Sequence, residues 1–81
     1  MIVAVIPALD EAGSIGAVVD DLKPHVDRVV VVDNGSRDDT AAVAAARGAL
    51  VALEPRRGYG AACLHGIARA VELDATLIVM L

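Results

Sequence analysis

The segment "EPRRGYG", residues 54–60, carries the densest positive charge in the chain. Arg56 and Arg57 stand next to each other, and Gly58 and Gly60 follow directly before an apolar pattern typical of a helix. Backbone N–H groups at the start of a helix bind phosphate groups well, and an arginine adds charged hydrogen bonds to such an anion. The alternative is a plain turn with solvated arginines, because short motifs of this kind are often coincidental.

Two other polar segments also follow apolar runs directly. "PALDE" occupies residues 7–11 and "DNGSRDD" occupies residues 33–39. Asp33 and Asn34 can accept hydrogen bonds from a ribose or a base N–H, and they equally suit a turn in which Asp33 caps the next helix. Glu11 stands where a first helix is expected to begin, and a carboxylate there also stabilises the helix dipole.

Four apolar runs indicate short β-strands, at residues 2–6, 28–33, 49–53 and 75–81. Each run is apolar on both faces, which is typical of strands buried within a parallel sheet. Pro7 is expected to end the first strand, because proline cannot donate to a strand ladder.

Three helical patterns separate these runs. The first begins near Ile15 and ends before Pro24, and the second is alanine-rich and ends with Gly48 as its C′ residue. Ser36 and Asp39 resemble a capping box for the second helix. The spacing of four residues predicts the buried face of the third helix: Leu64, Ile67, Ala68 and Val71.

The β-α-β-α-β-α-β order predicts an α/β fold with a parallel, doubly wound sheet and helices on both faces. In such sheets ligands bind beyond the carboxyl ends of the strands. All three polar segments follow strands, so they are expected to converge at one edge of the sheet.

The composition of the chain excludes some classes of function. The chain has 81 residues and a net charge of -4, which excludes the basic surface of a general nucleic-acid binder. The single cysteine, Cys63, excludes an internal disulfide and indicates a reducing, cytoplasmic location. Cys63 and His65 have no further ligand types near them, so we interpret both as packing or surface residues and expect no metal site or catalytic residue in this chain.

Taken together, three segments resemble the N-terminal half of family 2, GT-A fold glycosyltransferases, and most closely the polyprenyl- and dolichyl-phosphate sugar transferases. The segments are "VIPALDEAGSIGAVV", "VVVVDNGSRDDT" and "EPRRGYGAA". The resemblance implies that residues 1–81 form the nucleotide-binding half of a Rossmann-like GT-A domain, truncated after the fourth strand. It implies a UDP- or GDP-sugar donor and an acceptor such as a polyprenyl phosphate, at the inner face of the membrane.

The resemblance also assigns nucleotide-binding roles to residues in each of the three loops. The first loop implies contacts with the base and ribose from Pro7, Ala8, Leu9 and Glu11. The second implies contacts with the base or ribose from Asp33 and Asn34. The third lies by the nucleotide and implies roles for Arg56, Arg57, Gly58 and Gly60.

The chain departs from the family pattern at several points. Asp10 replaces a more usual Asn, Asn34 replaces the second acid of a pair, and Leu9 stands where some members stack an aromatic ring on the base. The family's metal-binding Asp-x-Asp is expected beyond Leu81, so a divalent metal, Mg or Mn, would have its ligands outside this chain. The fragment alone is expected to be inactive and to self-associate through its last strand.

Two alternatives remain open from the sequence. A dinucleotide-binding oxidoreductase shares the strand order and the acidic residue after the second strand, but residues 7–16 lack its G-x-G-x-x-G pattern. A non-catalytic α/β binding module that uses the exposed fourth strand is the other.

Overall fold

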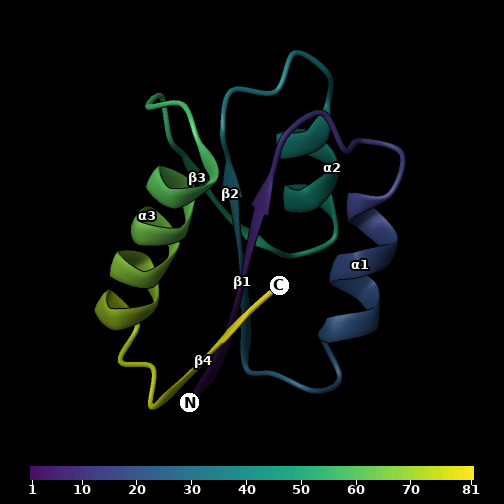
Figure 1. Ribbon diagram of the computed structural model, residues 1–81. Helices are drawn as coiled ribbons and strands as arrows, with labels where there is room; N and C mark the ends of the chain where they lie inside the picture. Colours follow the sequence, from purple (N-terminus) through teal and green to yellow (C-terminus); the bar gives the residue numbers. More distant parts are fainter.

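The chain folds into a four-stranded parallel sheet with helices on both faces (Figure 1). The computed structural model describes all residues, 1–81. The strands are β1 (Ile2–Ala8), β2 (Arg28–Asp33), β3 (Leu50–Leu53) and β4 (Leu77–Met80). The helices are α1 (Ile15–Leu22), α2 (Thr40–Ala46) and α3 (Tyr59–Glu72). The strand order β3-β2-β1-β4 confirms the predicted fold class.

The first strand is longer than predicted, because it continues through Pro7 to Ala8. Val5 accepts a hydrogen bond from the Leu81 N–H at 3.0 Å on the β4 side. The next donor on that side belongs to position 7, where proline has no N–H, so the pairing with β4 ends there. On the other side β1 still pairs with β2, and Pro7 lies opposite Val32.

Each face of the sheet has its own apolar core. Helices α1 and α2 cover one face and α3 covers the other, on opposite sides of the strands in Figure 1. The core under α1 and α2 contains Ile6, Ala8, Ile15, Val19, Val29, Val31, Ala44 and Ala49. The core under α3 contains Val3, Val5, Val30, Val32, Ala52, Ala62 and Ala70. Alternate residues of β1 and β2 supply both cores, as the twofold periodicity of strands requires.

The buried face of α3 differs from the predicted one. Ala62, Gly66 and Ala70 are buried against the sheet, whereas the four residues expected there are exposed: Leu64, Ile67, Ala68 and Val71. A Cβ atom on Gly66 would lie 2.2 Å from Val5 Cγ1, so the helix backbone sits directly on a β-branched strand residue. Only small residues fit on this face, because the backbone of α3 lies so close to the sheet. The prediction from apolar spacing was therefore wrong about which side of the helix is buried.

The ends of α2 show one confirmed prediction and one wrong one. Gly48 has φ +94° and donates to Ala45 O at 3.0 Å, while Ala49 N donates to Ala44 O at 3.1 Å. These two bonds form a Schellman motif, which confirms Gly48 as C′. The capping box is absent, because the N-cap residue Asp39 makes no side-chain cap bond and Ser36 bonds elsewhere.

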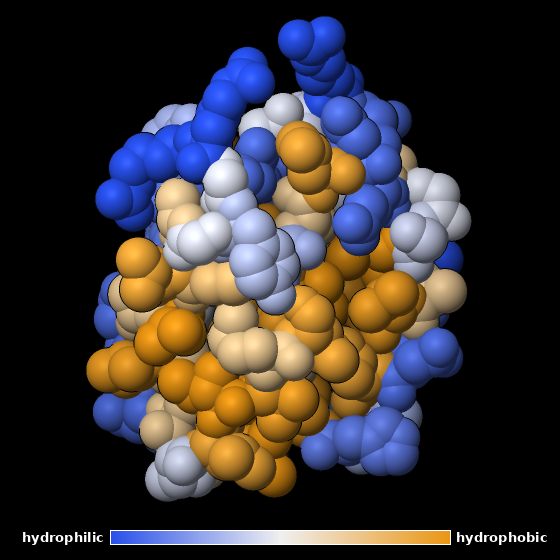
Figure 2. Space-filling view, viewed as in Figure 1, coloured by the Kyte–Doolittle hydropathy of each residue, from blue (hydrophilic) through white to orange (hydrophobic).

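An apolar patch lies over α3 and β4 on the face shown in Figure 2, below a polar upper rim. Its exposed members are Leu64, Ile67, Val71, Leu77 and Met80. Leu64 is 65% exposed, although leucine is usually buried. None of the three helices is long and apolar enough to cross a membrane.

The contact at Gly66 yields the first testable prediction. We expect Gly66→Ala to destabilise the chain by about 1–3 kcal/mol, because the new methyl group overlaps Val5. Gly60→Ala is the matched control: a Cβ there meets nothing within 4 Å, so this variant should be neutral or more stable by up to about 1 kcal/mol. Urea unfolding of both variants measures the difference, and equal stabilities would contradict the tight packing of α3.

Candidate functional site

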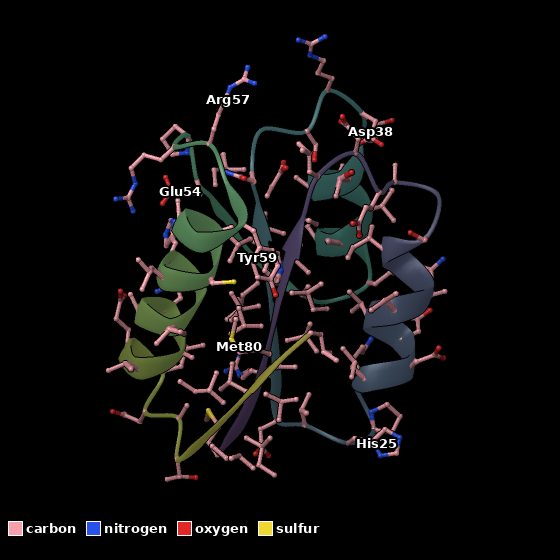
Figure 3. All side chains as sticks on the ribbon, in the orientation of Figure 1. His25, Asp38, Glu54, Arg57, Tyr59 and Met80 are labelled. Carbon is pink, nitrogen blue, oxygen red and sulfur yellow. The ribbon has the colours of Figure 1, made fainter.

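Three loops converge at the carboxyl ends of the strands and enclose an open cleft of about 1070 Å³. They join β1 to α1, β2 to α2, and β3 to α3. Asp38, Glu54 and Arg57 lie at this end of the sheet in Figure 3, and His25 lies at the opposite end. The predicted convergence of the polar segments is therefore present in the structure.

The first and second loops are joined by a reciprocal pair of bonds at Asp10. The Asp10 N–H donates to Ser36 Oγ at 2.9 Å, and Asp10 Oδ1 accepts from the Arg37 N–H at 2.7 Å. Asp10 adopts a left-handed conformation, φ 52°, which aspartate tolerates better than most residues. Asp10 thus connects the loops rather than standing free in the cleft.

A second set of bonds joins the same loops at Asp38 and Thr40. Thr40 Oγ1 accepts from the Glu11 N–H at 2.8 Å, and Asp38 Oδ2 accepts from the Ala12 N–H at 3.1 Å. The Thr40 hydroxyl and N–H both donate to Asp38 Oδ1. These bonds, the Thr40 hydroxyl bond foremost, lower the pKa of Asp38, because they favour the charged carboxylate.

Asp33 ends β2 and is only 6% exposed. Its Oδ1 accepts from the Ser36 N–H at 2.9 Å, so the carboxylate shapes the turn after the strand. This is a turn-forming role of the kind that the sequence left open, although the bond goes to Ser36 and not to the helix itself. Asp33 is not among the residues that line the cleft.

The third loop is held by Glu54, which is 5% exposed at the end of β3. The Arg56 guanidinium donates to both carboxylate oxygens, at 3.1 and 3.3 Å, and the Arg56 N–H donates at 2.9 Å. These bonds lower the pKa of Glu54, and His65 Nδ1 at 3.4 Å adds to the effect. Arg56 is therefore bound to Glu54 within the third loop, and it is not among the residues that line the cleft.

Arg57 behaves differently from its neighbour. Its side chain extends away from the body of the protein in Figure 3, and it lines the cleft with Arg37 from the second loop. Neither guanidinium makes an ion pair, whereas Arg47, Arg56 and Arg69 are all paired with carboxylates. The cleft therefore offers two guanidinium groups without an ion-pair partner, which suit an anionic ligand, beside the carboxylates of Asp10 and Glu11.

Seven of the ten residues predicted for the nucleotide line the cleft: Pro7, Ala8, Leu9, Glu11, Asn34, Arg57 and Gly58. Three do not: Asp33, Arg56 and Gly60. The lining also includes residues that the sequence analysis did not assign to the site, among them Asp10, Gly35, Arg37, Pro55, Tyr59 and Leu81. Arg37 could have been predicted from the sequence, because it is the only cationic residue within the second polar segment, residues 33–39.

The acidic side chains near the cleft are not grouped as metal ligands usually are. No group of three or more His, Cys, Asp or Glu side chains is placed to hold an ion. The carboxylates near the cleft are instead engaged with backbone N–H groups of the loops, as Asp10 and Asp38 show.

The lowered pKa of Asp38 predicts a pH dependence. The folded-state pKa lies below the unfolded value, so the stabilisation is complete above about pH 4 and is lost as the pH falls through the folded pKa. We expect the stability of Asp38→Asn to change less between pH 7 and pH 3 than that of the parent chain. Urea unfolding at both pH values measures this, with Asp21→Asn, on the exposed surface of α1, as a control that should keep the parental slope.

Comparison with known proteins gives consistent results. The chain is 48% identical over 69 residues to an uncharacterized glycosyltransferase of Mycobacterium bovis, covering 85% of this chain and 31% of that protein. It is 49% identical over 51 residues to glucosyl-3-phosphoglycerate synthase of Mycolicibacterium paratuberculosis, covering 58% of this chain and 16% of the synthase. The chain thus spans less than a third of each of these two relatives.

Solved structures show the same relationship. Glucosyl-3-phosphoglycerate synthase from Mycobacterium tuberculosis, in complex with Mn²⁺, UDP and glucosyl-3-phosphoglycerate, superimposes with a TM-score of 0.87 at 32% identity. The match covers 100% of this chain and 32% of the synthase. Residues 3–79 match glycosyl transferase family 2, and the chain therefore belongs to that family.

Proposed function

We propose that residues 1–81 form the N-terminal, nucleotide-binding half of a GT-A domain that transfers a sugar from a UDP-sugar to an acceptor. The observation that carries the proposal is the cleft, where apolar, amide and cationic groups from three loops meet. These groups suit the three parts of a nucleoside diphosphate. Apolar side chains can contact the base, polar acceptors can bind the ribose hydroxyls, and arginines can bind the phosphates. Family membership favours this function over an oxidoreductase or a non-catalytic module.

The proposed roles follow from where the side chains lie. Leu9 is half exposed in the cleft and offers an apolar surface to the base, with Pro7 and Ala8 beside it. Glu11 also lines the cleft, and its proposed role is to accept hydrogen bonds from the ribose hydroxyls. Arg57 faces the diphosphate in this proposal, because it stands just before α3, whose first-turn N–H groups lack helical partners. The Gly58 N–H is not among these free groups, since it donates to Asn34 Oδ1.

Not all predicted residues receive a direct role in this proposal. Asp33 and Arg56 hold the turns of the second and third loops through Ser36 and Glu54. Both residues therefore support the loops of the nucleotide site without contacting the nucleotide. Gly60 belongs to the first turn of α3. The residues that touch the nucleotide are thus fewer than the sequence predicted.

The donor and acceptor are proposed by chemistry shared with the similar proteins. UDP is favoured over GDP because the superimposed synthase is in complex with UDP. Another complex of that synthase contains Mn²⁺, UDP-glucose and phosphoglyceric acid. A phosphorylated acceptor is common to this synthase and to the polyprenyl-phosphate branch, so we propose that acceptor class. A divalent metal would take its ligands from outside this chain.

A cytoplasmic location follows from the proposed donor and from the single free cysteine, Cys63. A polyprenyl phosphate acceptor would bring the enzyme to the inner face of the membrane, whereas a small phosphorylated acid would not. Transfer assays with each acceptor class would separate the two, with product formation as the readout.

Nucleotide binding provides the direct test. We expect UDP to bind the chain and NAD not to bind, in calorimetric titrations performed side by side. Arg57→Ala should weaken UDP binding about tenfold or more, because it removes a charged contact to the diphosphate. Arg28→Ala removes the same charge at the opposite end of β2 and should leave the affinity unchanged. Binding of NAD without UDP would contradict the proposed function.

Self-association through β4 is proposed from the same structure. Beyond β4 the sheet has no further strand, so one edge of β4 carries unpaired backbone groups beside the exposed Leu77 and Met80. We expect light scattering to show concentration-dependent association of the 81-residue chain, and Met80→Lys to reduce it. A monodisperse parent chain over the same concentration range would contradict this expectation.

A further inference from the structure

The side chain of Asn34 bridges the second and third loops. Its Nδ2 donates to Glu54 O at 3.0 Å and to Arg56 O at 2.7 Å, and its Oδ1 accepts from the Gly58 N–H at 3.1 Å. Asn34 is the first residue after β2, and its own N–H donates to Ala8 O at 2.9 Å. The bridge is therefore anchored to the sheet on the β2 side.

The three partners fit an amide and do not fit an acid. A carboxamide has two N–H donors and one carbonyl oxygen, and here both donors and the oxygen have partners of the right kind. An aspartate of the same shape has only acceptor oxygens when ionised, so it would face Glu54 O and Arg56 O without a hydrogen. Asn34, which replaces the acidic residue of the family pattern, thus provides the N–H donors that the carbonyl groups of Glu54 and Arg56 require.

The bridge holds the part of the third loop that forms the cleft. The last ladder bond between β2 and β3 runs from the Glu54 N–H to Asp33 O at 2.9 Å. Beyond it, the only hydrogen bonds from another loop to residues 56–58 come from Asn34. Gly58 has φ +113°, a conformation that favours glycine, and one bond of the bridge ends at its N–H.

We propose that Asn34 is a positioning residue for nucleotide binding: its amide fixes residues 54–58 so that Arg57 and the backbone at Gly58 face the cleft. The inference rests on the proposed function and changes the role of one residue within it. The bridge occupies both amide donors, so Asn34 acts on the nucleotide through the third loop rather than by selecting the base. An acid at position 34 would release the loop while keeping the size of the side chain.

The first test needs no ligand. Amide hydrogen exchange, followed by NMR on the nucleotide-free chain, should be faster at Gly58 in Asn34→Ala and Asn34→Asp than in the parent. Exchange at Val30 and Val32, in the centre of the sheet, should stay slow and shows that each variant is folded. Ser36→Ala is the control from the same loop, because Ser36 makes no hydrogen bond to residues 54–58, and it should leave Gly58 exchange unchanged.

The second test measures UDP affinity in a double-mutant cycle with Arg57. Asn34→Ala should weaken UDP binding about tenfold in the parent chain. The same change made in Arg57→Ala should cost less than about twofold, since the residue through which it acts is already absent. A residue that contacted the nucleotide itself would give the full loss in both backgrounds.

Several results would overturn the inference. Unchanged exchange at Gly58 in both variants would show that Asn34 does not hold the loop. Additive losses in the cycle would make Asn34 a direct contact, and fast exchange throughout the sheet in both variants would make it a residue of general stability. Failure of the parent chain to bind UDP would contradict the proposed function instead, and Gly58 exchange would still decide whether the bridge exists.

Discussion

The central position of β2 in the sheet is the constraint on which the site depends. In the order β3-β2-β1-β4, the loop after β2 lies between the loops that follow β3 and β1. Backbone groups beyond the strand ends have no ladder partners, and unpaired polar groups are costly where water is excluded. Short polar side chains from residues 33–40 supply the partners, with Ser36, Asp38 and Thr40 reaching the first loop and Asn34 reaching the third.

The same arrangement determines which charged groups near the cleft are already engaged. The carboxylates of Asp10, Asp38 and Glu54 lie near the cleft, but each accepts hydrogen bonds from backbone N–H groups or from a guanidinium. Hydrogen bonds stabilise the charged form of these carboxylates: the Thr40 hydroxyl lowers the pKa of Asp38, and Arg56 lowers the pKa of Glu54. Arg37 and Arg57 form no ion pair, and they line the cleft together with the carboxylate of Glu11.

Most of the fold was predictable because β-branched runs and loop residues signal parallel strands directly. The parallel pairing and the helices on both faces followed from the order of the elements, and the Gly48 terminus followed from turn chemistry. The face of α3 was not predictable from apolar spacing. Its buried side is set by how closely the backbone can approach Val5, and Gly66 carries no hydropathy signal for such contact. The apolar side of α3 instead joins the patch beside β4.

The convergence of the three polar loops was predictable from the sequence, whereas which of their side chains line the cleft was not. Asp, Asn, Ser and Arg at the strand ends serve equally well as ligand contacts and as loop supports, because both tasks use the same donors and acceptors. Arg56 and Arg57 are adjacent and chemically identical, yet one is bound to Glu54 and the other faces the cleft. Only the path of the third loop distinguishes them. Since the Asn34 side chain supplies the bonds that join residues 56–58 to the second loop, the role of Arg57 depends on a residue 23 positions earlier in the chain.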